Sequence, residues 1–254
     1  RFSCSVHQGE TEGMSTPLPR HPGALVGDLW VVTTGRGDPL VLLHGNSETH
    51  RVFDPLVPYL GGSFTLVGLD SRGHGLSPRG TQGLTIASMA DDVEQTLREL
   101  DLTGVPVVGF SDGANIAIEL ALRHPGVASS LVLIGANLFP EGLKPGSKAV
   151  TDAAHAVSAF GARYLPDLEP LAERLGLMVH DPSIDPGDLA GIEVPALVVT
   201  GERDVILPEH TQLLTSSLAQ GRHVQIPGVG HMVPRDAPGA LALAIREHLS
   251  GSSE

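Results

Sequence analysis

The sequence predicts an α/β protein in which a mostly parallel central sheet carries helices on both faces. Short apolar runs that end in Gly or Asp alternate with longer amphipathic stretches along most of the 254 residues. These runs are continuous and rich in β-forming residues, which is typical of strands that are buried on both faces of a parallel sheet. The repeated order of strand and helix places helices on both sides of that sheet.

Six apolar runs are expected to be core strands, and an antiparallel pair is expected to precede them. The stretch GALVGDLWVVTTGRGDP, from Gly23, indicates one or two early strands joined by a Gly-Asp turn. The core strands are PLVLLHG from Pro39, FTLVGLD from Phe64, VPVVGF from Val105, SLVLIGA from Ser130, VPALVVTG from Val194 and RHVQIPG from Arg222. Amphipathic helices are expected at 51–60, 86–100, 114–124, 209–219 and 238–249.

One segment interrupts this alternation. Between 137 and 191 no run suits a core strand, but helices are expected near 147–160 and 167–178. An insertion of about 55 residues between two strands lies above the strand ends, where ligands of open α/β sheets bind. We therefore expect a core of residues 23–136 and 192–250, and a helical lid of residues 137–191. Residues 1–22 are expected to be a leader without function.

Composition and charge exclude several classes of function. Lys and Arg total 16 against 29 Asp and Glu, a net charge of −13, and no basic run is present, so nucleic acid is not an expected partner. Cys4 is the only cysteine, which indicates a reducing compartment, the cytoplasm, and no zinc site. No apolar stretch approaches the roughly 20 residues that span a bilayer. The oligomeric state is not predicted by the sequence.

The stretch GFSDG at 109–113 places Ser111 between two glycines, after an apolar run and before a helical pattern. A nucleophile elbow requires this strand-turn-helix setting, because its turn is too tight for side chains two residues before and after the serine. Gly109 and Gly113 meet that condition. The helix start would also stabilise negative charge. The alternative is that Ser111 is a simple helix N-cap.

A nucleophilic serine needs a histidine base and a carboxylate that orients the histidine. Both residue types follow at the ends of later strands. Asp204 lies in VVTGERDVILP, and His231 lies in IPGVGHMVP. Glu202 and Glu209 compete with Asp204, although either could be a solvated loop charge.

With these motifs the sequence resembles the α/β-hydrolase superfamily, whose triad follows the order nucleophile, acid, histidine. The resemblance extends from about Gly23 onward and rests on five motifs in the family's order: HGN, DSRGHGLS, GFSDG, GERD and GHM. It implies a triad of Ser111, Asp204 and His231.

The HGN motif resembles the family's oxyanion loop. It implies an oxyanion hole formed by the backbone N–H groups of Asn46 and Asp112. The Asn46 side chain could add a donor or only shape the loop, and His44 and His74 are expected to shape their loops. The Asp112 carboxylate has two interpretations: it is stabilised by the helix dipole alone, or it pairs with an ammonium group on the substrate.

The resemblance also implies the chemistry. Haloalkane dehalogenases and soluble epoxide hydrolases of the superfamily carry Asp at the nucleophile position, so Ser111 favours acyl transfer. We expect a carboxylesterase that acts on small-molecule esters of small to medium size, with no metal and no cofactor. The alternatives are a lactonase, a cofactor-free perhydrolase, a carbon–carbon bond hydrolase and a non-catalytic ligand receptor.

Apolar residues of the lid and one neighbour of His231 are expected to line the substrate pocket, although the lid residues could equally form the core of the lid. The candidates are Leu138, Phe139, Leu143, Phe160, Leu165, Met178 and Met232.

Overall fold

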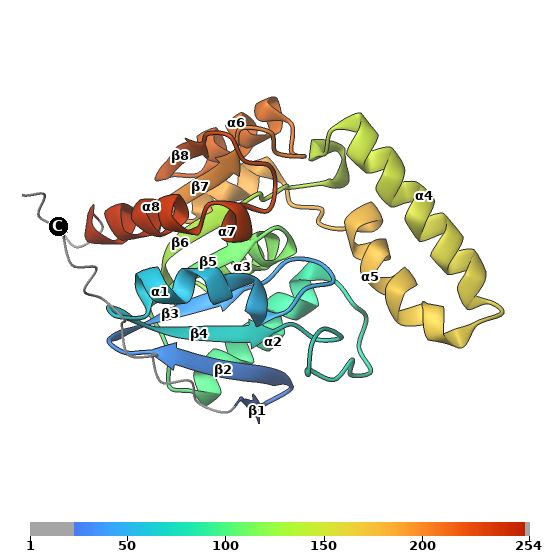
Figure 1. The fold of residues 1–254 in the computed structure, drawn as a ribbon, viewed down its shortest axis with the longest axis horizontal. Helices are drawn as coiled ribbons and strands as arrows, with labels where there is room; N and C mark the ends of the chain where they lie inside the picture. Colours follow the sequence, from blue (N-terminus) through green and yellow to red (C-terminus); the bar gives the residue numbers. More distant parts are fainter. Residues whose placement is uncertain (1–22, 252–254) are drawn as a thin grey trace, which may run out of the picture.

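The computed structural model describes residues 23–251, which are organised around an eight-stranded sheet (Figure 1). The strand order is β1-β2-β4-β3-β5-β6-β7-β8. β2 is antiparallel to both of its neighbours, and all other pairs are parallel, so the predicted class is confirmed. The strands are β1 (Ala24–Val26), β2 (Leu29–Gly35), β3 (Asp38–Leu43), β4 (Phe64–Asp70), β5 (Val105–Phe110), β6 (Ala128–Ile134), β7 (Ala196–Gly201) and β8 (Gly221–Ile226).

Helices cover both faces of the sheet, because side chains in the strands alternate between two hydrophobic cores. In β3, Val41 and Leu43 enter the core beneath α2, α3 and α6, whereas Leu40 and Leu42 enter the core beneath α1, α7 and α8. The helices of the first face are α2 (Ile86–Glu99), α3 (Asp112–Arg123) and α6 (Pro208–Ser217). Those of the second face are α1 (Val57–Leu60), α7 (Val233–Asp236) and α8 (Pro238–Gly251).

Two further helices, α4 (Pro145–Ala162) and α5 (Glu169–His180), lie between β6 and β7 in the chain. They pack against each other and project beyond the end of the sheet to which β3 and β4 point (Figure 1). We call residues 145–180 the α4–α5 arm. Short 3-10 helices complete the chain: η1 (His50–Leu56), η2 (Pro140–Gly142), η3 (Pro166–Leu168) and η4 (Pro186–Gly191). The expected leader, residues 1–22, lies outside the described residues.

Two expected elements differ from the observed ones. The single helix expected at 51–60 is instead η1 followed by the one-turn α1, because Pro55 and Pro58 lack the N–H groups that a continuous α-helix needs. β8 was expected to be buried on both faces, but it is the last strand of the sheet and only Ile226 is buried. No helix among residues 23–251 combines the length and the apolar composition needed to cross a membrane.

A buried ion pair fastens the loop after β4 to α2. Nε and Nη2 of Arg72 donate to the two carboxylate oxygens of Asp92, and these side chains are only 7% and 8% exposed. In the same loop, the Ser71 N–H donates to Nε2 of His44, which lies in the loop after β3. The ion pair therefore supports two of the loops at the carboxyl ends of the strands.

Replacing Asp92 by Asn should lower the free energy of unfolding by about 3–5 kcal/mol, because it leaves the buried Arg72 charge unpaired. Glu94→Gln is the matched control on the same helix. Its partner, Arg98, is 67% exposed, so the loss should stay below about 1 kcal/mol. Urea denaturation followed by circular dichroism measures both, and equal losses in the two variants would contradict this account.

Candidate active site

Ser111 occupies a sharp turn between β5 and α3. Its φ of 54° and ψ of −119° lie in a region that residues with side chains rarely adopt. The turn is held by the Ser111 N–H, which donates to the Ile134 carbonyl at 2.7 Å, and by the Ser111 carbonyl, which accepts from Ala114 N–H at 2.8 Å. The hydroxyl makes no capping bond to α3, which leaves the N-cap interpretation without support.

The two flanking glycines are required by close backbone approaches. A Cβ at Gly109 would lie 2.2 Å from the Gly113 carbonyl oxygen, and a Cβ at Gly113 would lie 2.0 Å from the Leu43 carbonyl oxygen. Both neighbours are backbone atoms, which cannot move away as a flexible side chain would. The start of α3 therefore packs directly on the end of β3.

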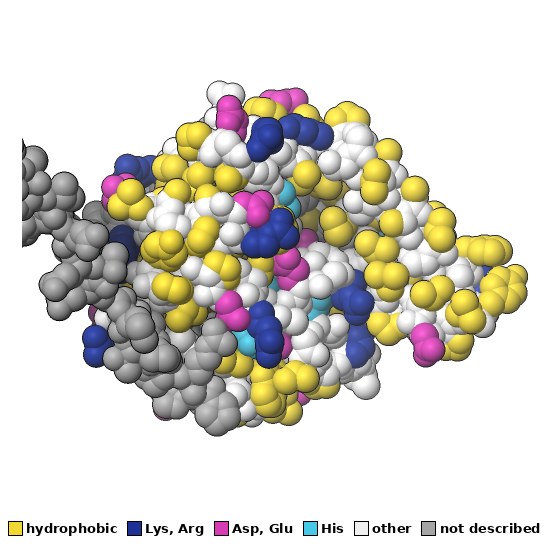
Figure 2. Space-filling model, in the orientation of Figure 1, with side chains coloured by type: hydrophobic (Ala, Val, Ile, Leu, Met, Phe, Trp, Pro, Cys, Tyr) yellow, Lys and Arg dark blue, Asp and Glu magenta, His cyan; other side chains and the backbone are white. Residues whose placement is uncertain are grey.

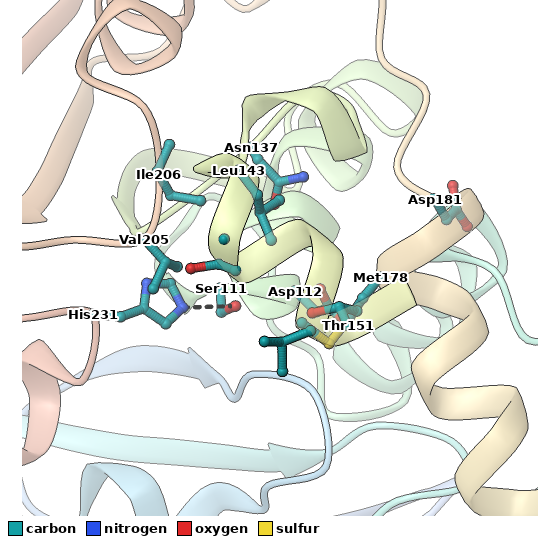
Figure 3. A pocket seen from close by; sticks show the side chains of 13 residues that line it. Ser111, Asp112, Asn137, Leu143, Thr151, Met178, Asp181, Val205, Ile206 and His231 are labelled. Carbon is teal, nitrogen blue, oxygen red and sulfur yellow. Dashed lines mark hydrogen bonds between the residues drawn. The ribbon is translucent and has the colours of Figure 1, made fainter. Parts of the chain in front are cut away.

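The structure brings Ser111, His231 and Asp204 together from the ends of three strands. The Ser111 hydroxyl lies 3.1 Å from Nε2 of His231 (Figure 3), and Nδ1 of His231 lies 2.7 Å from Oδ1 of Asp204. The loop carrying His231 fits because residue 135 is glycine: a Cβ there would lie 2.6 Å from Cε1 of the ring. Glu202 instead accepts from the backbone N–H of residue 228, at 2.7 Å.

Asp204 is held as a carboxylate. Burial alone would raise its pKa, but the hydrogen bond and charge of His231 outweigh burial, and backbone N–H groups add to this effect, so its pKa is lowered. These N–H groups belong to Ile206, which donates to Oδ1 at 3.2 Å, and Gly201, which donates to Oδ2 at 3.3 Å. An ionised Asp204 fixes His231 with a proton on Nδ1 and leaves Nε2 free to accept one.

The two expected oxyanion donors flank the serine. Asn46 lies in the loop after β3, and Asp112 is the first residue of α3. Within residues 23–251 neither backbone N–H group meets a protein acceptor. The Asn46 side chain is otherwise engaged, because Nδ2 donates to Oδ2 of Asp112 at 2.9 Å and to the Arg174 carbonyl at 2.7 Å. That amide therefore shapes the loop and links it to α5.

The histidine of the HGN motif has the local role that was expected. Nδ1 of His44 donates to the Gly45 carbonyl at 2.8 Å, and Nε2 accepts from Ser71 N–H at 2.9 Å. Burial, followed by the nearby His74, lowers the pKa of His44 to about 4, so the ring is neutral at physiological pH. Nδ1 of His74 donates to the Arg72 carbonyl at 3.0 Å.

A cavity of about 500 Å³ adjoins the serine and the histidine (Figure 3). Its walls come from the loops after β5, β6 and β7 and from both helices of the α4–α5 arm. The apolar lining consists of Leu143, Val150, Met178, Val205 and Ile206, and the polar lining includes Asp112, Asn137, Thr151 and Asp181. Among residues 23–251 no group of three or more His, Cys, Asp or Glu side chains is placed to hold a metal ion.

Five expected pocket residues do not line this cavity, and one of them, Leu165, is 61% exposed. Leu138 is fully buried in the core, and its N–H donates to His210. Phe139 packs edge-on against the ring of His210, with 4.6 Å between centroids. Phe160 is 59% exposed on the arm, where other apolar side chains also face solvent (Figure 2), and Met232 packs on the core beneath α8. Hydrophobicity identified these residues as apolar but did not give the direction of their side chains.

Several lining residues were missed, although some carry a signal. Val205 and Ile206 directly follow Asp204, and Asn137 follows the end of β6, so their place at the carboxyl ends of the strands could have indicated them. Asp181, just after α5, had no such signal, because only the packing of the arm brings it to the cavity.

The chain is similar to known proteins over most of its length. Residues 38–176 match the model of the alpha/beta hydrolase fold family. A pimeloyl-[acyl-carrier protein] methyl ester esterase of Methylococcus capsulatus is 31% identical over 216 residues, which cover 71% of this chain and 82% of that esterase. A 2-(acetamidomethylene)succinate hydrolase of Mesorhizobium japonicum is 27% identical over 244 residues, which cover 83% of this chain and 87% of that hydrolase. The solved structure of a thermophilic esterase from Thermogutta terrifontis shares the fold, with a TM-score of 0.72 at 22% identity, over 94% of this chain and 100% of that one.

Substituting Ala for Gly113 should lower the free energy of unfolding by about 2–3 kcal/mol and lower hydrolytic activity, because the added methyl overpacks the contact with β3. Gly62→Ala is the control, since a Cβ there meets nothing within 4 Å. Thermal and urea unfolding of both variants measures the difference. A Gly113→Ala protein as stable as the control would show that α3 does not pack as described.

Proposed function

The chain belongs to the α/β-hydrolase fold family, and we propose that it is a serine hydrolase that cleaves small to medium carboxylic esters through an acyl-enzyme. The observation that carries the proposal is the hydrogen-bonded series from the Ser111 hydroxyl through His231 to Asp204, beside a cavity. A serine hydroxyl is a weak nucleophile until a neighbouring base accepts its proton. His231 has the position and the tautomer for that role.

In the acylation step, Oγ of Ser111 attacks the carbonyl carbon of the ester while its proton passes to Nε2 of His231. The carbonyl oxygen becomes an oxyanion, which accepts hydrogen bonds from the backbone N–H groups of Asn46 and Asp112. Asp204 stabilises the imidazolium through its bond to Nδ1. The bond from the carbonyl carbon to the alcohol oxygen then breaks, and the alcohol leaves with the proton from His231.

In the deacylation step, water takes the place of the alcohol. His231 accepts a proton from the water molecule as its oxygen attacks the acyl carbon, and a second oxyanion forms in the same hole. The bond to Oγ of Ser111 breaks, and the proton on His231 returns to that oxygen. One ester and one water molecule thus give one alcohol and one carboxylic acid, and the protein is regenerated.

The cavity supports the expected size of substrate. About 500 Å³ lies within the range of small-molecule sites, and its apolar walls suit an acyl or alcohol group of moderate size. Similarity to a methyl ester esterase and to a thermophilic esterase supports an ester as the substrate. We propose in addition that residues 137–191 form the lid of this site, since Val150, Thr151 and Met178 of the arm line the cavity.

Ser111→Ala and His231→Ala should each lower kcat by about 10⁴- to 10⁶-fold, because the triad acts as a unit. Asp204→Asn should cost less, about 10⁴-fold. Turnover of p-nitrophenyl esters of graded chain length measures these losses. Ser216→Ala, at an exposed serine on α6, is the control, and unchanged melting temperatures show that the variants fold. A tenth of wild-type turnover in either alanine variant of the triad would exclude this assignment.

Activity should rise with pH between about pH 5 and pH 8, because only a neutral imidazole accepts the serine proton. Incubation with EDTA should leave the rate unchanged, since the proposed steps use only protein groups and water. Initial rates in buffers of constant ionic strength measure both. A flat profile, or a loss of activity that added zinc restores, would contradict the mechanism.

A further inference from the structure

We propose that the Asp112 carboxylate forms a subsite for a substrate ammonium group, so that the preferred substrates are esters of α-amino acids. This inference rests on the proposed hydrolase function and specifies its substrate class. It is carried by the position of Asp112 in the cavity, by its incomplete hydrogen bonding and by the charges around it.

Asp112 is a buried carboxylate that faces the cavity with one oxygen unpaired. The residue is 8% exposed, and it lines the cavity directly beside Ser111. Oδ2 accepts one hydrogen bond, from Nδ2 of Asn46 at 2.9 Å, whereas Oδ1 accepts none from the described residues. A carboxylate offers about four acceptor sites, and those of Oδ1 are unused by the described residues but are not sealed from solvent. A donor from a bound ligand would complete the set.

Among residues 23–251, no Lys or Arg forms an ion pair with this carboxylate. The described residues that line the cavity include no Lys and no Arg, but they include a second carboxylate, Asp181. Figure 3 shows Asp112 beside Ser111, toward Thr151 and Met178, and Asp181 farther along the cavity at the end of α5. Two carboxylates without a basic partner attract a cation and repel an anionic substrate.

Asp112 is nevertheless ionised at neutral pH. Burial raises its pKa to about 6, the hydrogen bond from Asn46 opposes this effect, Asp181 adds to it, and His231 opposes it. The charged form therefore predominates at pH 7. An anion beside the oxyanion hole disfavours the negative charge that develops on the substrate, unless a positive charge is bound between them.

An α-amino acid ester meets this requirement. Asp112 offers its backbone N–H to the carbonyl oxygen and its carboxylate to the ammonium group, so one residue binds two groups at a fixed close spacing. In an α-amino acid ester the ammonium group is carried by the carbon next to the carbonyl carbon, which is the shortest spacing on the acyl side. The apolar walls, including Val150 and Met178, would hold the amino-acid side chain.

The test compares kcat/KM for phenylalanine methyl ester and for methyl 3-phenylpropionate, which lacks only the amine. The ratio of the two kcat/KM values is then divided by the ratio of the rate constants for hydroxide-catalysed hydrolysis of the same two esters. This correction removes the activation of the ester by its own ammonium group. At pH 7 the corrected ratio should be roughly 10 to 100 for the wild type, the range expected of a desolvated charge pair. Asp112→Asn keeps the backbone N–H and the shape of the side chain, and its corrected ratio should fall to about 1.

Asp101→Asn is the matched control. It makes the same chemical change at an exposed residue just beyond α2, outside the cavity, and it should keep the wild-type ratio. If Asp112→Asn does not fold, as judged by its melting temperature, Asp112→Ser provides the same comparison.

The pH dependence of the ratio gives a second readout. The wild-type ratio should fall as the pH drops through about 6, where Asp112 takes up a proton. The amine of the substrate binds more protons as the pH falls, so its own titration cannot cause this loss. In Asp112→Asn the ratio should not change with pH.

A corrected wild-type ratio near 1, or a preference that survives in Asp112→Asn, would overturn the inference. Failure of the proposed function has a different signature: neither ester would be hydrolysed, or hydrolysis would persist in Ser111→Ala. Hydrolysis of both esters at equal corrected rates would therefore keep the hydrolase and remove the ammonium subsite.

Discussion

The site depends on the close approach of the start of α3 to the end of β3. β3 and β5 are neighbours in the sheet, with Leu43 paired to residue 109, so the loops that follow them begin side by side. Only glycine at position 113 lets the helix start reach the Leu43 carbonyl. This contact brings the loop that carries Asn46 next to the turn that carries Ser111 and Asp112. Neighbouring strands thus hold the strained serine, which would otherwise relax to a commoner backbone conformation.

Glycine also permits close contacts where the loop that carries His231 meets the sheet. A Cβ at Gly201 would lie 2.1 Å from the carbonyl oxygen of residue 230, and Gly135 leaves room for the ring of His231. The acid and the base therefore come from loops whose backbones touch. Since the separation of these loops is set by backbone contacts, the distances from Asp204 to His231 and from His231 to Ser111 depend little on flexible side chains.

The sequence predicted the parts of this protein that backbone geometry determines. The strands, most helix bounds and the three residues that hydrogen-bond in series all carry local signals, because a tight turn or a buried strand needs particular residues at particular spacings. The cavity walls were predicted poorly. Leu138 and Phe160 are as apolar as the cavity residues Leu143 and Met178. However, Leu138 lies in the core and Phe160 faces solvent. Which apolar side chain faces the cavity is decided by how the α4–α5 arm packs on the core, and no local pattern encodes that. The cytoplasmic location stays a prediction.

The arm is also connected to the proposed oxyanion loop and to Asp112 through one polar residue, Asn46. Nδ2 of Asn46 bonds both to Asp112 and to the carbonyl of Arg174 in α5, while the guanidinium of Arg174 donates to Oγ of Ser47 at 3.3 Å. A shift of α5 away from the core would break these bonds, release the loop after β3 and expose the Asp112 carboxylate to water. The burial of Asp112, on which the proposed ammonium subsite rests, and the geometry of the proposed oxyanion hole thus depend on the same position of α5. A ligand that pairs with Asp112 stabilises this position of α5 only if it binds the arrangement described here more tightly than one in which α5 lies farther from the core. In the proposed mechanism, therefore, recognition of charge and stabilisation of the transition state are linked by a single side-chain amide.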